Sequence, residues 1–282
     1  MIIDSQVHPY AANTAARPWR NTPAWPDHVT GREMVTAMEA VGVDAAILVS
    51  PFILYGYDAS YALQVHREFP DKFALVKMID SADQAVAEHI AEWKKTPGTV
   101  GIRLRIDNKV STQPDDPGVT TAVQAAAQHD LAVNVLCGGR IRAAIELVDR
   151  HPNARFVIDH LGLDQHLPIS ERPWADLDQV IELSRRDNVV IKVSGACVLS
   201  REPFPYADIW DPLQRIFDAW GVDRCLWGTD WTRTSTKVSY EQATLPFRLT
   251  DRLTACERAT LMGGACAKAY RWTPPGKEKL TP

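Results

Sequence analysis

The sequence has no long hydrophobic run and no excess of basic residues. No apolar stretch reaches the roughly 18 residues that a membrane-spanning helix needs. The 31 lysines and arginines are outnumbered by 35 aspartates and glutamates, so the net charge is −4 and no basic stripe suits a nucleic acid. The first residues also lack the basic and apolar regions of a signal peptide. We therefore expect a cytoplasmic protein that binds neither a membrane nor a nucleic acid.

Cysteine is scarce, and its spacing forms no motif. The five cysteines are odd in number, widely spaced and without a CxxC pair; they are Cys137, Cys197, Cys225, Cys256 and Cys266. Such a set indicates neither a disulfide framework nor a structural zinc site. We expect reduced thiols that pack mostly as small core residues.

What the sequence does contain is a regular alternation of short apolar runs and helical patterns. Eight runs rich in β-branched residues occupy residues 2–4, 45–50, 73–78, 100–106, 132–137, 155–160, 189–194 and 225–230. Several are continuously apolar, which is typical of parallel strands that are covered on both faces.

Helical spacing fills the intervals between these runs. In the first interval Thr30 is a suitable N-cap, with Glu33 as its capping-box partner. The later helical segments are residues 58–68, 81–94, 118–129, 140–150, 174–186, 211–220, 240–251 and 254–270. Eight strand-helix repeats predict an α/β fold, a (β/α)₈ TIM barrel that forms a single domain over residues 1–272. A doubly wound open sheet is the alternative. The tail at residues 273–282 is predicted to be disordered.

Polar or ionisable side chains stand at the end of every predicted strand. Barrel enzymes carry their chemistry at the carboxyl ends of the strands. We predict that His8, His160 and Asp230 are catalytic, because a barrel that only packs a core would not need them at one rim. The predicted substrate-binding residues are Gln6, Ser50, Lys77, Arg103, Arg105, Asn134 and Ser194.

Each catalytic candidate also has an ordinary structural interpretation. A lone histidine after a strand is often only a hydrogen-bonding group, and a lone aspartate there often caps or braces a loop. His160, however, ends an apolar strand, where an ionisable group is costly to bury unless it is used. The joint placement of His8, His160 and Asp230 at predicted strand ends favours a shared site.

Two arginines point to the charge of the substrate. Arg103 and Arg105 are two residues apart in one predicted strand, so their side chains face the same side. Two guanidinium groups on one face suit a small anionic substrate held by bidentate hydrogen bonds. The alternative is an ion pair at the barrel rim, for which Asp107 is the partner at hand.

Three motifs together resemble the amidohydrolase superfamily, in its amidohydrolase-related group of metal-dependent hydrolases. They are Ile-Ile-Asp-Ser-Gln-Val-His at residues 2–8, Val-Ile-Asp-His-Leu-Gly at 157–162 and Trp-Gly-Thr-Asp-Trp at 227–231. The resemblance covers about residues 1–272 and is closest to lactone hydrolases that act on sugar lactones, pyrone dicarboxylate and muconolactone-type compounds. It implies hydrolysis of a lactone ring, with Asp230 as general base and His8 and His160 polarising the carbonyl.

The sequence departs from the metal-binding pattern of that superfamily. Its usual His-x-His is Gln6-Val7-His8 here, and Asn134 and Cys137 stand where metal-binding members carry a histidine. The resemblance therefore implies either no obligatory cofactor or one divalent ion, zinc or manganese, held by His8, His160 and Asp230.

Two other functions stay open at the level of sequence. One is a metal-dependent decarboxylase of an aromatic or muconic acid on the same barrel. The other is a non-catalytic barrel that binds a small anion or serves as an assembly scaffold. Because two-fold dimers are the commonest symmetric assembly, a homodimer is the oligomer that base rates favour.

Overall fold

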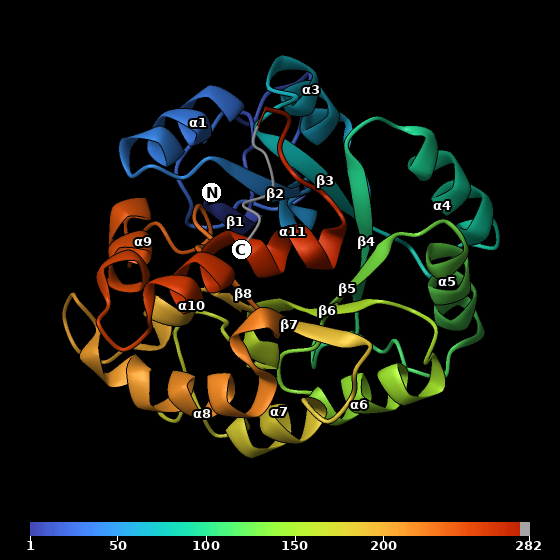
Figure 1. The fold of residues 1–282 in the computed structure, drawn as a ribbon. Helices are drawn as coiled ribbons and strands as arrows, with labels where there is room; N and C mark the ends of the chain where they lie inside the picture. The colour runs from blue at the N-terminus through green and yellow to red at the C-terminus, as the bar shows by residue number, and fades with distance from the viewer. Residues whose placement is uncertain (277–282) are drawn as a thin grey trace.

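The computed structural model describes residues 1–276, in which eight parallel strands are ringed by helices (Figure 1). The strands are β1 (Ile3–Val7), β2 (Ala45–Val49), β3 (Phe73–Met78), β4 (Thr99–Arg105), β5 (Ala132–Leu136), β6 (Phe156–Ile158), β7 (Val189–Ser194) and β8 (Cys225–Gly228). Each pairs in parallel with the next along the chain. All eight lie at the predicted runs.

The sheet closes on itself between β8 and β1. Val7 forms a parallel bridge with Trp231, which follows β8. One residue earlier, the backbone N–H of Asp230 donates to the carbonyl oxygen of Gln6 at 3.0 Å. The predicted (β/α)₈ barrel is confirmed, and the open-sheet alternative is wrong because the two edge strands meet.

Apart from the single turn of α2, the helices also follow the predicted segments. They are α1 (Gly31–Ala40), α2 (Phe52–Tyr55), α3 (Ser60–Glu68), α4 (Val86–Lys95), α5 (Pro117–Gln128), α6 (Ile141–Arg150), α7 (Leu177–Leu183), α8 (Trp210–Trp220), α9 (Tyr240–Leu249), α10 (Ala255–Ala259) and α11 (Ala265–Tyr270). The predicted capping box at the start of α1 is present, since Thr30 and Glu33 bond to each other's backbone N–H groups. A π-helical turn at Thr260–Gly264 joins α10 to α11 within the last predicted helix. None of the helices described is long and apolar enough to cross a membrane.

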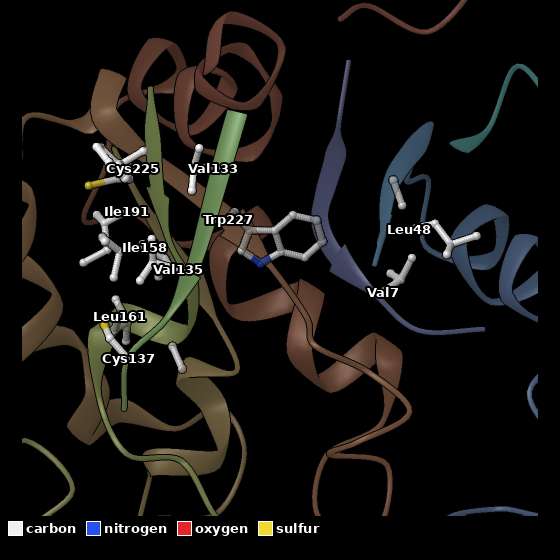
Figure 2. Close-up of a cluster of buried hydrophobic side chains, with 14 of the residues drawn as sticks. Val7, Leu48, Val133, Val135, Cys137, Ile158, Leu161, Ile191, Cys225 and Trp227 are labelled. Carbon is white, nitrogen blue, oxygen red and sulfur yellow. The ribbon is translucent and has the colours of Figure 1, made fainter. Parts of the chain in front are cut away.

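The hydrophobic core has two layers. The outward-facing side chains of the strands pack against the surrounding helices, and Figure 2 shows part of this layer, with Ile158, Ile191 and Cys225 near Val133 and Val135. Alternation along each strand sends the remaining side chains into the barrel.

Helix α11 closes the amino-terminal end of the barrel. It lies across the middle of the strands in Figure 1, and its side chains, including Cys266 and Tyr270, pack with inward-facing Ile47 and Val76. Apolar residues thus fill the lower part of the barrel, and polar residues are left at its carboxyl-terminal end. Of the predicted tail, residues 273–276 form no helix or strand, and residues 277–282 lie outside the described chain.

One acid, Asp4, is buried at the seam between β1 and β8. Its Oδ1 accepts hydrogen bonds from the backbone N–H groups of Gln6 and Thr229, both at 3.0 Å. Its Oδ2 accepts from the hydroxyls of Thr229 at 2.6 Å and of Tyr240 at 3.0 Å. Within residues 1–276 no basic side chain pairs with it, and burial raises the pKa of Asp4 to about 6 despite these four donors.

This acid makes the stability of the seam dependent on pH. An unfolded aspartate has a pKa of about 3.9, so the folded state binds the Asp4 proton more tightly. The stabilisation is complete below about pH 4 and is lost as the pH rises through about 6. Relative to Asp4→Asn, the wild type should lose roughly 2 kcal/mol of unfolding free energy between pH 4 and pH 7.

Urea unfolding followed by circular dichroism at several pH values measures this difference. Asp71→Asn, which removes an exposed carboxylate, is the control for the loss of a negative charge. A difference between Asp4→Asn and the wild type that stays constant from pH 4 to pH 7 would contradict the interpretation.

Candidate active site

A cavity of about 350 Å³ opens at the carboxyl-terminal end of the barrel. Its polar wall includes His8, Arg103, Arg105, His160 and Arg233. The strands that carry these side chains are far apart in the sequence, but barrel closure brings their ends to one rim. The volume lies at the lower end of the range for small-molecule sites.

His8 and Asp230 lie side by side at this rim. His8 Nδ1 lies 2.7 Å from the carbonyl oxygen of Val49, which can only accept, so Nδ1 carries a proton. His8 Nε2 lies 3.1 Å from Asp230 Oδ1 and 3.1 Å from the side-chain amide nitrogen of Gln6. The amide donates, so Nε2 holds a lone pair next to a carboxylate. This arrangement suits a proton acceptor whose charged form the carboxylate stabilises.

His160 is held in the same tautomer, by different partners. Arg103 Nη2 lies 3.1 Å from His160 Nε2, and because a guanidinium only donates, Nε2 is the acceptor. The remaining proton is therefore on Nδ1, which lies 3.0 Å from Ser194 Oγ and 3.6 Å from Asp230 Oδ2. Burial lowers the pKa of His160 to about 3, so its imidazole is neutral near pH 7.

Asp159 joins the site because the backbone turns sharply after β6. His160 has a φ of 53°, in the left-handed region that non-glycine residues rarely adopt. This turn lets Asp159 and His160, consecutive in sequence, both face the barrel interior. Asp230 occupies the same region with a φ of 52° at the end of β8. Backbone strain of this kind gathers at functional sites.

Asp159 lies between two buried cations. Its Oδ2 is 2.6 Å from Arg103 Nε and its Oδ1 is 3.0 Å from Lys192 Nζ. Burial alone would raise the pKa of Asp159, but Arg103 and Lys192 hold it well below its usual range. Lys192 Nζ also donates to Gln6 Oε1 at 2.6 Å, and this bond turns the Gln6 amide nitrogen toward His8.

Arg233, which the sequence reasoning missed, ties the loops after three strands together. Its Nε pairs with Asp230 Oδ2, and its terminal nitrogens donate to the backbone carbonyl (2.8 Å) and side-chain oxygen (3.1 Å) of Gln165. Gln165 in turn donates to the carbonyl oxygens of His160 and Ser194. The sequence held one sign of this contact: Arg233 follows Asp230 by three residues, a spacing at which side chains meet within a turn.

Asp230 is ionised and fully buried at the centre of this cluster, with 0% of its surface exposed. Burial alone would raise its pKa, but Arg233, His160 and His8 together hold the pKa of Asp230 well below its usual range. The side chains that line the cavity in front of it are His8, His160 and Arg233. The carboxylate therefore acts on the cavity through its neighbours.

The structure thus brings together all three predicted catalytic residues and part of the predicted substrate-binding set. Arg103 and Arg105 both line the cavity, as their two-residue spacing indicated. Arg105 also makes the rim ion pair considered as its alternative, with its Nε 2.9 Å from Asp107 Oδ2. Gln6 and Ser194 contact the two histidines and lie behind the cavity wall.

Besides Gln6 and Ser194, three more predicted substrate-binding residues lie outside the cavity lining. Lys77 faces outward because Val76 and Met78 take the inward positions of β3, and its ammonium lies 4.9 Å from the ring centre of Trp93. Ser50 donates to the carbonyl oxygen of Asp58 in the following loop, at 3.0 Å. Lys77 is therefore excluded from the cavity by the alternation of side chains along β3, and Ser50 by its hydrogen bond to the following loop.

Asn134 points into the barrel but too deep to reach the cavity. Its amide nitrogen donates to the carbonyl oxygen of Ile102 at 3.0 Å, and its oxygen accepts from the hydroxyl of Tyr270 in α11. Asn134 therefore connects the polar layer of the barrel to the helix that closes its other end.

Two of the three predicted metal ligands already have other partners. His160 Nε2 accepts from Arg103, and Asp230 Oδ2 pairs with Arg233. Among the residues described, no group of three or more His, Cys, Asp or Glu side chains is arranged to hold a metal ion.

The charge balance at this end of the barrel also disfavours a bound metal ion. Four cationic side chains face three carboxylates; they are Arg103, Arg105, Lys192 and Arg233 against Asp107, Asp159 and Asp230. A divalent cation would add to an existing positive excess in a poorly solvated place. These residues therefore do not fit the single zinc or manganese ion considered from the sequence.

Comparisons with known proteins agree with this architecture. An L-fucono-1,5-lactonase from Burkholderia ambifaria is 32% identical over 180 residues, which cover 62% of this chain and 60% of that protein. A 4-sulfomuconolactone hydrolase from Hydrogenophaga intermedia is 28% identical over 202 residues, 71% of this chain and 64% of that protein. The alignments thus span less than two thirds of both relatives.

A solved structure extends the likeness to the whole barrel. An amidohydrolase from Burkholderia multivorans with bound zinc superimposes with a TM-score of 0.80, at 24% identity over 97% of this chain and 100% of that one. At that identity the likeness concerns the fold. The profile of the amidohydrolase family matches residues 3–272. Because this match takes in all eight strands and the residues at their ends, the chain belongs to the amidohydrolase family.

Proposed function

We propose that the protein hydrolyses a lactone ring, with His8 and Asp230 acting as one proton-accepting pair. The observation that carries the proposal is the 3.1 Å contact between His8 Nε2 and Asp230 Oδ1, with His8 Nδ1 anchored on a backbone carbonyl. A base that a backbone carbonyl orients through Nδ1, with a carboxylate beside the nitrogen that takes the proton, suits the activation of water at the wall of a small cavity. The names of the two lactone-hydrolysing relatives support the reaction type.

The proton acceptor is assigned to His8 in place of Asp230. A carboxylate with a strongly lowered pKa is a weak base, and Asp230 is also fully buried. His8 lines the cavity and has its lone pair on Nε2. In this scheme Asp230 stays ionised and stabilises the imidazolium that forms on His8.

The reaction then proceeds in two steps. Water attacks the lactone carbonyl carbon while its proton passes to His8 Nε2, and the carbonyl oxygen becomes an oxyanion. When the tetrahedral intermediate collapses, the ring C–O bond breaks and the leaving oxygen takes the proton from His8. The product is an open-chain hydroxy acid, which ionises and releases one proton to solvent.

Arg103 and Arg233 supply the positive charge that faces the oxyanion. Both line the cavity, and both are fixed by ion pairs, Arg103 with Asp159 and Arg233 with Asp230. Preorganised donors of this kind are each worth about 3–4 kcal/mol of transition-state stabilisation. His160 orients Arg103 through its acceptor Nε2, a different role from the carbonyl polarisation that the family resemblance implies.

This chemistry needs no metal ion, because guanidinium groups hold the positions next to the reacting oxygen. The decarboxylase alternative requires a divalent ion at the same place, and the positive excess there disfavours it. The alternative of a non-catalytic barrel does not account for an oriented base, His8, beside Arg103 and Arg233.

Substitution of the pair is the first test. Asp230→Asn and His8→Asn should each lower kcat for lactone opening about 10³-fold or more, because one removes the counter-charge and the other the proton acceptor. The double variant should lose no more than the worse single variant, since the two residues act as a unit. Proton release in weakly buffered solution measures the rate, and thermal melting checks the fold.

Asp178→Asn on the exposed surface of α7 is the matched control and should keep the wild-type rate. Wild-type turnover by Asp230→Asn would refute the assignment. Fully additive losses in the double variant would mean that His8 and Asp230 work in separate steps.

Chelation is the second test. Dialysis against EDTA should leave the rate of lactone opening unchanged, because the positive charge at the site comes from Arg103 and Arg233. Elemental analysis of the same samples measures the bound metal. Loss of activity that zinc or manganese restores, or release of carbon dioxide from an aromatic acid, would favour the metal-dependent alternative.

A further inference from the structure

The two arginines of β4 differ in what they can still bind. Arg103 is buried, and its Nε and Nη2 are engaged with Asp159 and His160. Arg105 has its Nε bonded to Asp107, and no hydrogen bond within the described chain uses either of its terminal nitrogens. Its side chain is 24% exposed and lines the cavity. The free end of Arg105 is therefore a two-pronged donor directed at a ligand.

Arg105 is held in place by the protein itself. Asp107, which fixes its Nε at 2.9 Å, is fully buried and also accepts from the backbone N–H of Lys109 at 2.9 Å. The guanidinium carbon lies 5.8 Å from the ring centre of Phe52, another residue of the cavity wall. Carboxylate and sulfonate groups match the spacing of its two terminal nitrogens.

Most of the remaining cavity wall is apolar. Its hydrocarbon side chains come from several loops and strand ends; they are Trp25, Phe52, Ile53, Met78, Leu136, Leu163 and Leu167. A planar or unsaturated ring with few polar substituents can bury its surface against these side chains at a gain of about 25 cal/mol per Å².

Polar groups that would recognise a hydroxyl-rich ring are few in the same wall. Asp107 and Gln165 already use their side-chain polar atoms within the protein. The amide nitrogen of Asn21 is bonded to the carbonyl oxygen of Ile53, and Nδ1 of His166 is bonded to Asp164. Each sugar hydroxyl left unpaired in the cavity would cost about 1–3 kcal/mol.

We propose that the substrate is a lactone with an apolar ring and one anionic group, a carboxylate or sulfonate, which the free end of Arg105 binds. Hydroxyl-rich sugar lactones are then poor substrates, although one relative is named for such a compound. The proposal rests on the proposed lactone hydrolysis and adds to it the class of lactone and the residue that selects it.

Four probes separate the two features of the substrate. Muconolactone carries a carboxylate, its primary amide is an uncharged analogue with the same ring, 4-sulfomuconolactone carries a sulfonate as well, and L-fucono-1,5-lactone is rich in hydroxyls. The wild type should open muconolactone with a kcat/KM about 100-fold or more above those of the amide and the sugar lactone.

Arg105→Met should lower kcat/KM for muconolactone about 100-fold, chiefly through KM, and change that for the amide by less than about threefold. Arg105→Lys keeps the charge beside Asp107 but loses the two-pronged donor, so a loss of about tenfold is expected even if Arg105→Met folds poorly. Arg150→Met, which removes an exposed arginine on α6, controls for the change in net charge.

Efficient opening of L-fucono-1,5-lactone, or equal losses on muconolactone and its amide in Arg105→Met, would overturn the proposal. If no probe is opened, the lactonase function itself fails, and calorimetric titration with the same compounds decides the specificity. Binding of muconolactone that weakens in Arg105→Met then supports the anion site. Equal binding of the amide or the sugar lactone rules the site out.

Discussion

The buried carboxylate of Asp159 is the interaction on which the arrangement of the site depends. It holds Arg103 on one side and Lys192 on the other, at 2.6 Å and 3.0 Å, and so joins the ends of β4, β6 and β7 inside the barrel. Arg103 then sets the tautomer of His160, and Lys192 orients Gln6. A buried ion pair of this kind adds little net stability, but losing one partner is costly because the other charge stays buried.

The same network explains why glutamine is accepted at position 6. In a metal-binding site a second histidine there would present a lone pair to the ion. Here Gln6 presents an oxygen to Lys192 and a nitrogen to His8, so it links a cation to a base without leaving a polar atom unpaired. These contacts form one electrostatic arrangement. Gln6 is paired with Lys192, and Arg103 and Arg233 lie beside His160 and Asp230.

The sequence predicted the fold well and the chemistry of the site less completely, for physical reasons. Continuous apolar runs identified the strands because each strand of a barrel is covered on both faces. Strand periodicity places Arg103 and Arg105 on one face of β4. The same alternation in β3 turns Lys77 outward, because its neighbour Met78 faces the cavity.

Contacts between distant loops were beyond reach from sequence. The left-handed turn at His160 brings Asp159 into the site. No local sequence pattern predicts such a turn at a non-glycine residue. Arg233 finds Gln165 only once the loops after β6 and β8 lie side by side. The tautomers of His8 and His160 likewise depend on partners from other strands, so the roles proposed for the two imidazoles could not be reasoned from the sequence.

The two ends of the barrel differ in composition: the amino-terminal end is packed with apolar side chains, and the carboxyl-terminal end holds the charged groups. At the amino-terminal end, α11 and inward-facing aliphatic residues fill the space, and the burial of their apolar surface stabilises the fold. Tyr270 of α11 reaches Asn134, and its ring lies 5.7 Å from Lys192 Nζ, so the closing helix also contacts the charged layer. The charged groups can therefore be held rigidly from below while their upper surface stays open to the cavity. Four cations and three carboxylates meet in the ion pairs of this layer, so the anion proposed as ligand would balance the charge that these pairs leave over.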